Sequence, residues 1–149
     1  MSRPLYETDA DLEREGNMVS VVESNWKCKL TKLPIRYHLD YVFTREDKPV
    51  AFCEMKTRNY PMDNLDRNGG YSIGLGKWMT AKTMSETSGL PFVLIVKLND
   101  GLYYSTFGDG HNSFKPDDMV ISGRIDRNDW QDIEPCVMIR AKRFKKLKD

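Results

Sequence analysis

The sequence predicts an α/β fold in which a mixed β-sheet is flanked by helices. Segments with helical and strand-like spacing follow one another in the order helix, three strands, helix, two strands. One of these segments, residues 91–98 (PFVLIVKL), is almost continuously apolar, as a strand covered on both faces would be. With 149 residues, 40% of them apolar, we expect a single domain over residues 1–149, with a core at 10–107 and a C-terminal strand and basic tail at 108–149.

The N-terminal half is expected to contain one helix and three strands. The helix covers residues 9–26, where Leu, Val and Trp recur at near-helical spacing. Short strands follow at 27–34, 36–43 and 49–57, and the turn residues TREDKP separate the last two. Because their connections are short, these strands should be antiparallel neighbours.

The C-terminal half is expected to begin with a long loop at residues 58–76, of a length that favours a functional role. A second helix follows at 77–89 and ends at a glycine. Residues 91–98 and 102–107 should form a hairpin around NDG. Residues 134–144 alternate in character, which predicts an edge strand or a docked tail.

Composition narrows the class of protein. Cys28, Cys53 and Cys136 are odd in number and far apart, so reduced thiols are expected and a zinc site is not. No segment approaches the roughly 18 apolar residues of a membrane span, and the N-terminus lacks the apolar core of a signal peptide. We therefore expect no membrane partner and a location in the cytoplasm of a bacterium or a virus-infected host cell.

Charged residues stand where buried strands should be apolar. Side chains alternate along a strand, so Glu54 and Lys56 share one face, and Asp40 in the preceding strand can meet Glu54 there. Two half-buried carboxylates repel each other unless a proton or a cation lies between them, and oxygen ligands of this kind suit Mg²⁺ or Mn²⁺. A metal beside a lysine is suited to phosphodiester hydrolysis.

A second Glu-x-Lys in the chain shows how weak the short motif is by itself. Glu46 and Lys48 have the same spacing, but they lie in the turn beside Pro49, where charges are solvated. The position of Glu54 and Lys56 at the end of an apolar strand separates the two motifs.

The motif resembles that of the PD-(D/E)XK nuclease superfamily. It consists of Asp40, thirteen intervening residues and then Glu54-Met55-Lys56, and a Glu-bearing helix precedes it. This superfamily has the restriction-endonuclease-like fold and includes archaeal-type Holliday junction resolvases. The element order α-β-β-β-α-β-β agrees over residues 10–107, although Leu39 stands where the family name has proline. The resemblance implies a nuclease that hydrolyses DNA with Mg²⁺ or Mn²⁺, and it allows a homodimer.

The resemblance also implies the roles of the central residues. Asp40 and Glu54 look like the metal-binding acids, the main-chain carbonyl of Met55 looks like a third ligand, and Lys56 looks like the catalytic lysine. The family often adds a glutamate from the first helix to the metal site.

Three glutamates of the first helix compete for that role. Glu15 is preferred because apolar residues follow it at the offsets that would bury the inner face of the helix. Glu13 is the second choice, and Glu23 is the third candidate.

Basic residues outside the motif are candidates for DNA contacts, and the second helix in such nucleases commonly offers polar residues to the site or to DNA, so Lys77 and Lys82 are candidates for either role. The loop at 58–76 combines arginines with Tyr60 and Tyr71, which could stack on bases, and residues 140–149 contain six basic residues. A solvated helix face, an exposed loop and a frayed terminus are the alternatives. The candidates are Arg58, Lys77, Lys82, Arg143, Lys145 and Lys146.

Two other functions remain open at this stage. The first is a catalytically inactive, nucleic-acid-binding protein that keeps the nuclease fold, and the second is a structural protein of a virus or mobile element. An intact Asp40, Glu54 and Lys56 set favours the enzyme, because two adjacent buried acids destabilise a fold that does not use them.

Overall fold

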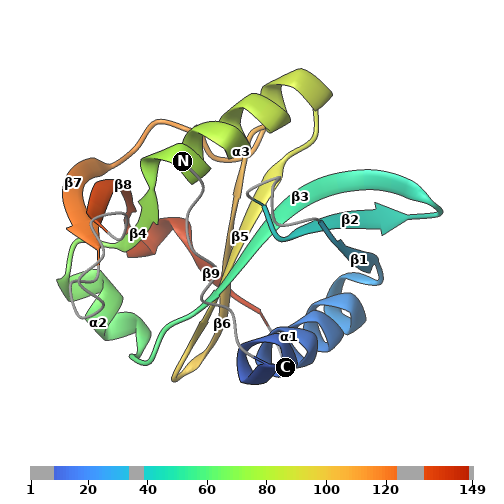
Figure 1. Cartoon of the computed structure of the whole chain (residues 1–149), viewed down its shortest axis with the longest axis horizontal. Helices are drawn as coiled ribbons and strands as arrows, with labels where there is room; N and C mark the ends of the chain where they lie inside the picture. Colours follow the sequence, from blue (N-terminus) through green and yellow to red (C-terminus); the bar gives the residue numbers. More distant parts are fainter. Residues whose placement is uncertain (1–8, 34–38, 124–132, 148–149) are drawn as a thin grey trace.

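The computed structural model describes residues 9–33, 39–123 and 133–147 (Figure 1). The elements are, in chain order, α1 (Asp9–Trp26), β1 (Lys29–Lys32), β2 (Tyr41–Arg45), β3 (Lys48–Thr57), α2 (Met62–Arg67), β4 (Tyr71–Gly74), α3 (Leu75–Ser88), β5 (Phe92–Leu98), β6 (Gly101–Phe107), β7 (Asp118–Gly123), β8 (Ile133–Ile139), a 3₁₀ turn (Ala141–Arg143) and β9 (Lys145–Lys146).

The predicted mixed sheet is confirmed. It has six strands in the order β1-β2-β3-β5-β6-β9, in which β3 and β5 are parallel and every other pair is antiparallel. The parallel pair is joined by a crossover that contains α2, β4 and α3. Such crossovers normally place a helix against the sheet, and α3 lies there.

Helices lie on opposite faces of this sheet, with α1 on one side and α3 on the other (Figure 1). Strand β5 is central and contributes to both cores: Val93 and Ile95 pack on the α1 side, and Leu94 and Val96 pack on the α3 side. All four side chains are buried, which is why this strand is almost continuously apolar.

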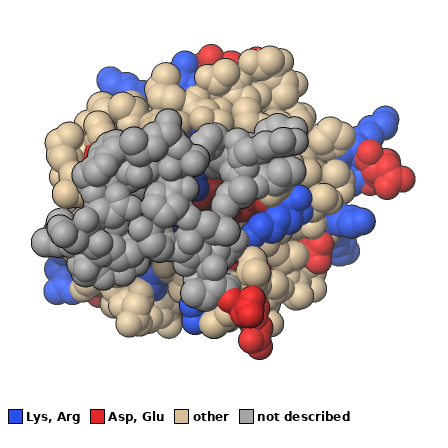
Figure 2. Space-filling model, viewed as in Figure 1, with Lys and Arg blue, Asp and Glu red and all other residues tan. Residues whose placement is uncertain are grey.

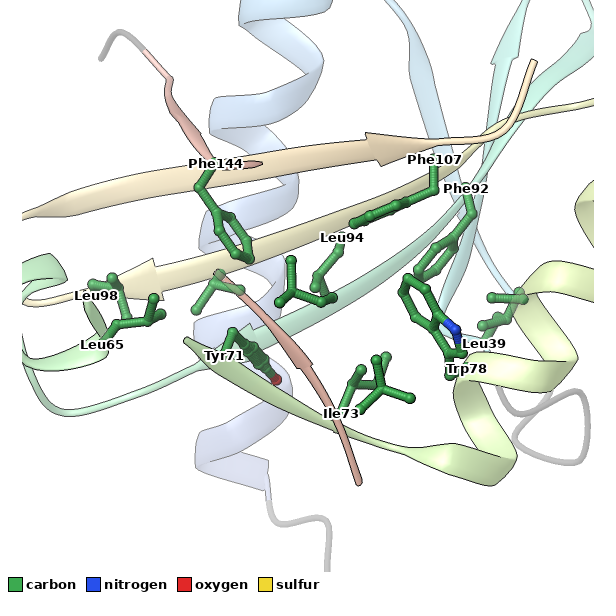
Figure 3. Close-up of a cluster of buried hydrophobic side chains, with 14 residues drawn as sticks. Leu39, Leu65, Tyr71, Ile73, Trp78, Phe92, Leu94, Leu98, Phe107 and Phe144 are labelled. Atoms are coloured by element: carbon green, nitrogen blue, oxygen red, sulfur yellow. The ribbon is translucent and has the colours of Figure 1, made fainter. Parts of the chain in front are cut away.

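The core on the α3 side is built around aromatic rings (Figure 3). Trp78 of α3 meets Phe107 at a ring-centroid distance of 5.0 Å with an edge-to-face geometry, and its indole N–H donates to the carbonyl of Phe114 at 3.1 Å. Phe92 of β5 stacks on the same ring of Phe107. These contacts fix α3 against the sheet and so fix the position of its first turn.

Two predictions about the second half of the chain were wrong. Residues 58–76 do not form one continuous loop, because they contain α2 and β4. Residues 134–144 do not form an edge strand, because β8 is the centre of a separate three-stranded sheet in the order β4-β8-β7. The two-residue β9, which follows this segment, lies at one edge of the six-stranded sheet, beside β6.

The structure also bears on the cysteines and on membrane-spanning helices. Cys28, Cys53 and Cys136 are free, and the last two are buried. Among the described residues, no helix combines the length and the apolar character needed to cross a lipid bilayer.

Gly70, directly before β4, is expected to be essential for attaching the second sheet. Its φ is +121°, and an added Cβ would lie 2.2 Å from the carbonyl oxygen of Ile139 in β8. We expect Gly70→Ala to lower the free energy of unfolding by roughly 2–4 kcal/mol, measured by urea denaturation.

Gly16 provides the matched control. It lies inside α1, with nothing within 4 Å of an added Cβ, so Gly16→Ala should raise the free energy of unfolding by about 0.5–1 kcal/mol. Equal effects of the two substitutions would contradict the close approach of Gly70 to β8.

Candidate active site

Asp40 stands one residue before β2, at the end of the antiparallel ladder with β3. Its backbone N–H donates to the carbonyl of Cys53 at 3.1 Å, and its Oδ2 accepts a hydrogen bond from the N–H of Met55 at 3.0 Å. The expected strand at 36–43 therefore begins later, at Tyr41, although residues 34–38 lie outside the described residues. The carboxylate of Asp40 is thereby held beside Glu54.

Glu54 is the charged residue at the centre of the sheet. Ala51, Cys53 and Met55 of β3 pack on the α1 side, so Glu54 points to the α3 side by alternation. Its neighbour across the parallel ladder is Leu94, and its side chain has no exposed surface. A carboxylate in this position takes the place of an apolar core residue.

Two lysines reach the same oxygen of Glu54. Nζ of Lys77, from the first turn of α3, lies 2.5 Å from Oε1, and Nζ of Lys56 lies 3.5 Å from the same atom. The other carboxylate oxygen, Oε2, is buried and has no hydrogen-bond partner among the described residues. Sequence analysis joined Glu54 to Lys56, but it missed the closer contact with Lys77, which depends on how α3 packs.

The protonation of Glu54 follows from these surroundings. Burial raises the pKa of the Glu54 carboxyl, and the nearby charge of Asp40 adds to the increase, whereas Lys77 and Lys56 oppose it. The two acids therefore interact electrostatically, as the strand register predicts.

The three helix acids have different environments. Oε2 of Glu15 accepts hydrogen bonds from Lys32 Nζ at 2.8 Å and from the Tyr41 hydroxyl at 3.0 Å. Glu13 is exposed, and Glu23 accepts a hydrogen bond from a backbone N–H of β1 at 2.9 Å. Glu15 is thus the helix acid that contacts β2 next to Asp40.

Glu15 is nevertheless not gathered into one cluster with Asp40 and Glu54. Within residues 9–33, 39–123 and 133–147, no three His, Cys, Asp or Glu side chains converge as a metal site. Tyr41 stands between them, and sequence analysis gave it no role. Burial and the hydrogen bond to Glu15 raise the pKa of Tyr41, so its phenol stays protonated and acts as a donor.

The donor set fits a hard divalent cation. Two carboxylates interact, and the unpartnered Oε2 of Glu54 is a buried oxygen with an unsatisfied negative charge. Such an atom destabilises the fold unless a proton or cation binds it. Mg²⁺ and Mn²⁺ prefer oxygen ligands of this type.

The basic residues that are candidates for DNA contacts differ in the contacts that their side chains already make within the protein. The Arg58 guanidinium lies 5.4 Å from the centre of the Tyr71 ring and donates to its hydroxyl at 3.4 Å. Tyr71 is only 2% exposed, so the expectation that it could stack on bases was wrong. Lys82 pairs with Glu86 one turn along α3, at 2.6 Å.

The basic tail is partly fixed to the fold. Nε of Arg143 lies 3.2 Å from Asp117 Oδ2, and its other nitrogens donate to the carbonyls of Ser113 and Lys115 at 3.2 and 2.9 Å. Lys145 and Lys146 form β9 and are exposed. Of these three residues, Arg143 therefore has the most contacts within the protein.

Charge on the visible surface is mixed. In Figure 2 the Lys and Arg side chains of the described residues are interspersed with Asp and Glu on the face shown. Any DNA contact on this part of the molecule would therefore depend on particular side chains rather than on one extended basic field.

The fold and the site together define a class of protein. A mixed sheet flanked by helices, with Asp40 directly before β2 and Glu54-x-Lys56 on the adjacent strand β3, is the arrangement expected of a PD-(D/E)XK nuclease. A family model described as "Phage putative PDDEXK endonuclease" matches residues 1–147. The chain belongs to this family, and the resemblance read from the sequence is confirmed.

A solved structure similar to this chain is Hjc, a Holliday junction resolvase from the hyperthermophilic archaeon Archaeoglobus fulgidus. The sequence identity is 13% and the TM-score is 0.44, over 64% of this chain and 73% of the resolvase. A comparison with curated protein sequences finds no significant match.

The raised pKa of Glu54 predicts how stability depends on pH without metal. The folded protein retains a proton that the unfolded chain releases near its ordinary Glu pKa of about 4.3. This contribution to stability is complete below that pH and is lost as pH rises through the raised folded-state pKa. Glu54→Gln removes the titration, so in EDTA the stability of the variant relative to wild type should increase as pH rises from 5 to 8.

Urea denaturation of both proteins between pH 5 and pH 8 measures this difference. Glu86→Gln is the control, because Glu86 makes an exposed ion pair with Lys82, and it should change stability by less than about 0.5 kcal/mol. If wild type instead gains stability relative to Glu54→Gln as pH rises, Lys77 and Lys56 lower the pKa of Glu54 by more than burial raises it.

Proposed function

We propose that this protein is a divalent-metal-dependent nuclease that hydrolyses phosphodiester bonds in DNA. One observation carries the proposal: Glu54 is a fully buried carboxylate with one oxygen that has no partner among the described residues, and it lies 3.5 Å from the Lys56 ammonium, while Asp40 is held on the N–H of the adjacent Met55. Membership of a phage endonuclease family supports the same activity.

Asp40, Glu54 and the main-chain carbonyl of Met55 would hold Mg²⁺ or Mn²⁺. The hydrogen bond from the Met55 N–H orients Asp40, and the strand ladder orients Glu54. When bound, the ion would polarise the scissile phosphate and stabilise the charge of the transition state. The structure supplies two acids, and substrate oxygens and water would complete the shell.

Lys56 has the position expected of the residue that prepares the attacking water. Its ammonium lies at the mouth of the site, since its side chain is 39% exposed and Glu54 is buried behind it. The Lys56 ammonium would orient the attacking water and stabilise negative charge on the phosphate, while the proton of that water passes to solvent and a solvent water protonates the leaving oxygen of the cleaved strand. Glu15 would act more weakly, through Tyr41, because its carboxylate already has two donors.

The strand register suggests which tail lysine can reach the substrate. Lys56, Val96, Tyr103 and Lys146 are partners in one row across the sheet, so their side chains share a face. Three strand spacings of about 4.8 Å place Lys146 about 14 Å from Lys56. Lys145 is in the next row, with Tyr104, and points to the α1 side.

Cleavage assays test the proposed activity. The substrates are labelled linear duplex, single strand, flap and four-way junction, each with Mg²⁺, Mn²⁺ or EDTA. We expect cutting that requires metal, and a loss of about 100-fold or more in Asp40→Asn, Glu54→Gln and Lys56→Met. Glu15→Gln should lose less.

The turn motif provides a matched control for this assay. Glu46→Gln and Lys48→Met change the same residue types at the same spacing, at the far end of the β2–β3 hairpin, and should cut like wild type. DNA binding without cutting in any metal would instead indicate an inactive binding protein. Neither binding nor cutting would favour a structural protein.

The adjacent tail lysines provide a separate test of the DNA path. Lys146→Ala should weaken binding and reduce the slope of log affinity against log salt by about one, because one phosphate contact is lost. Lys145→Ala should change binding less, because its side chain is on the other face. Equal effects, measured by fluorescence anisotropy at several salt concentrations, would contradict this path.

A further inference from the structure

Lys77 occupies an unfavourable position in its own helix. It lies in the first turn of α3, where the preceding Gly74 has no side chain to cap the helix and the sequence Leu75–Trp78 has no acid. The N-terminus of a helix carries partial positive charge, so a lysine there is disfavoured unless an anion lies beside it. Glu54, from strand β3, is that anion.

Lys77 is also the closer counter-ion of Glu54. Its Nζ is 1.0 Å nearer to Oε1 than that of Lys56, because the two distances are 2.5 and 3.5 Å. Its side chain is less exposed, at 28% against 39%. In the metal-free protein, Lys77 therefore supplies most of the positive charge that Glu54 requires.

A divalent cation and the Lys77 ammonium would compete for the same carboxylate. Two cations at one carboxylate repel each other, and the repulsion is strong where water is excluded. Glu54 has no exposed surface over which the two charges could separate. A metal at Oε2 would lie close to the Lys77 ammonium at Oε1, and the repulsion between the two cations favours the departure of Lys77.

The Lys77 side chain can move away from Glu54 more readily than the carboxylates of Asp40 and Glu54 can move. Among the described residues, the one ion-pair partner of the Lys77 ammonium is Glu54. Its four-carbon stem can change rotamer while the backbone of α3 stays fixed by Trp78. Asp40 and Glu54, in contrast, are held by the strand ladder and by the Met55 N–H.

We propose that Lys77 is an exchangeable internal cation: it pairs with Glu54 when no metal is bound, and it is displaced from Glu54 when a divalent ion binds. This inference rests on the proposed function, because it requires a metal at Glu54. Lys77 thereby keeps Glu54 charged and oriented before the metal arrives, and the exchange releases its ammonium for the DNA backbone. It is a positioning residue of the metal site.

Metal binding without DNA tests the exchange. Mn²⁺ affinity is measured by electron paramagnetic resonance of free Mn²⁺ at pH 8 in wild type, Lys77→Met and Lys77→Gln. Both variants should bind Mn²⁺ about five-fold more tightly or better, because the competing cation is absent. Lys82→Met is the control: it removes another lysine of α3, paired with Glu86, and should bind Mn²⁺ like wild type.

A measurement on the wild type keeps the inference testable if the Lys77 variants fold poorly. Lysines are acetylated briefly with an amine-reactive ester, with and without Mn²⁺, and each site is quantified by mass spectrometry. Lys77 should become several-fold more reactive with Mn²⁺, because its ammonium leaves the carboxylate, while Lys82 should not change.

The outcomes separate this inference from the proposed function. Mn²⁺ binding by wild type with no gain of affinity in the Lys77 variants, or with unchanged acetylation of Lys77, would overturn the exchange and leave the metal site intact. Absence of Mn²⁺ binding in every protein, wild type included, would overturn both.

Discussion

The buried carboxylate of Glu54 is the constraint on which the rest of the site depends. A negative charge in the middle of β3 destabilises the sheet unless cations are brought to it, and the fold brings them from two directions. Lys56 comes from the same strand, and Lys77 comes from the first turn of α3. The packing of Trp78 against Phe107 and Phe114 is thus more than core formation, because it fixes the helix end that carries Lys77.

The acids at the site accept hydrogen bonds from different kinds of donor, and this difference suggests different roles. Asp40 is oriented by a main-chain N–H, which a substitution cannot remove, whereas Glu15 is held by the side chains of Tyr41 and Lys32. The first arrangement is rigid and the second can rearrange. If the proposed function is correct, Asp40 and Glu54 would be a fixed pair of oxygen ligands, and Glu15 would be a nearby acid whose partners can change when a substrate binds.

Asp40, Glu54 and Lys56 could be singled out from the sequence because Asp40 directly precedes β2, and a short turn joins β2 to β3, which carries the other two residues. Period-two alternation then decides which side chains share a face, and no distant part of the chain is needed. The pairing of β4 with β8 joins residues more than sixty positions apart, and YSIG, with glycines at both ends, resembles loop. The contact of Lys77 with Glu54 likewise requires α3 to be packed, which spacing alone cannot predict.

The parallel pairing of β3 with β5 determines when the site can form during synthesis of the chain. Glu54 is covered on one side by β5, which follows it by about forty residues, and Lys77 comes from the crossover between them. A chain still emerging from the ribosome contains Asp40, Glu54 and Lys56 long before β5 can close over them. The geometry of the proposed site therefore cannot assemble until most of the chain has been synthesised, so a nascent or truncated chain would lack the proposed activity.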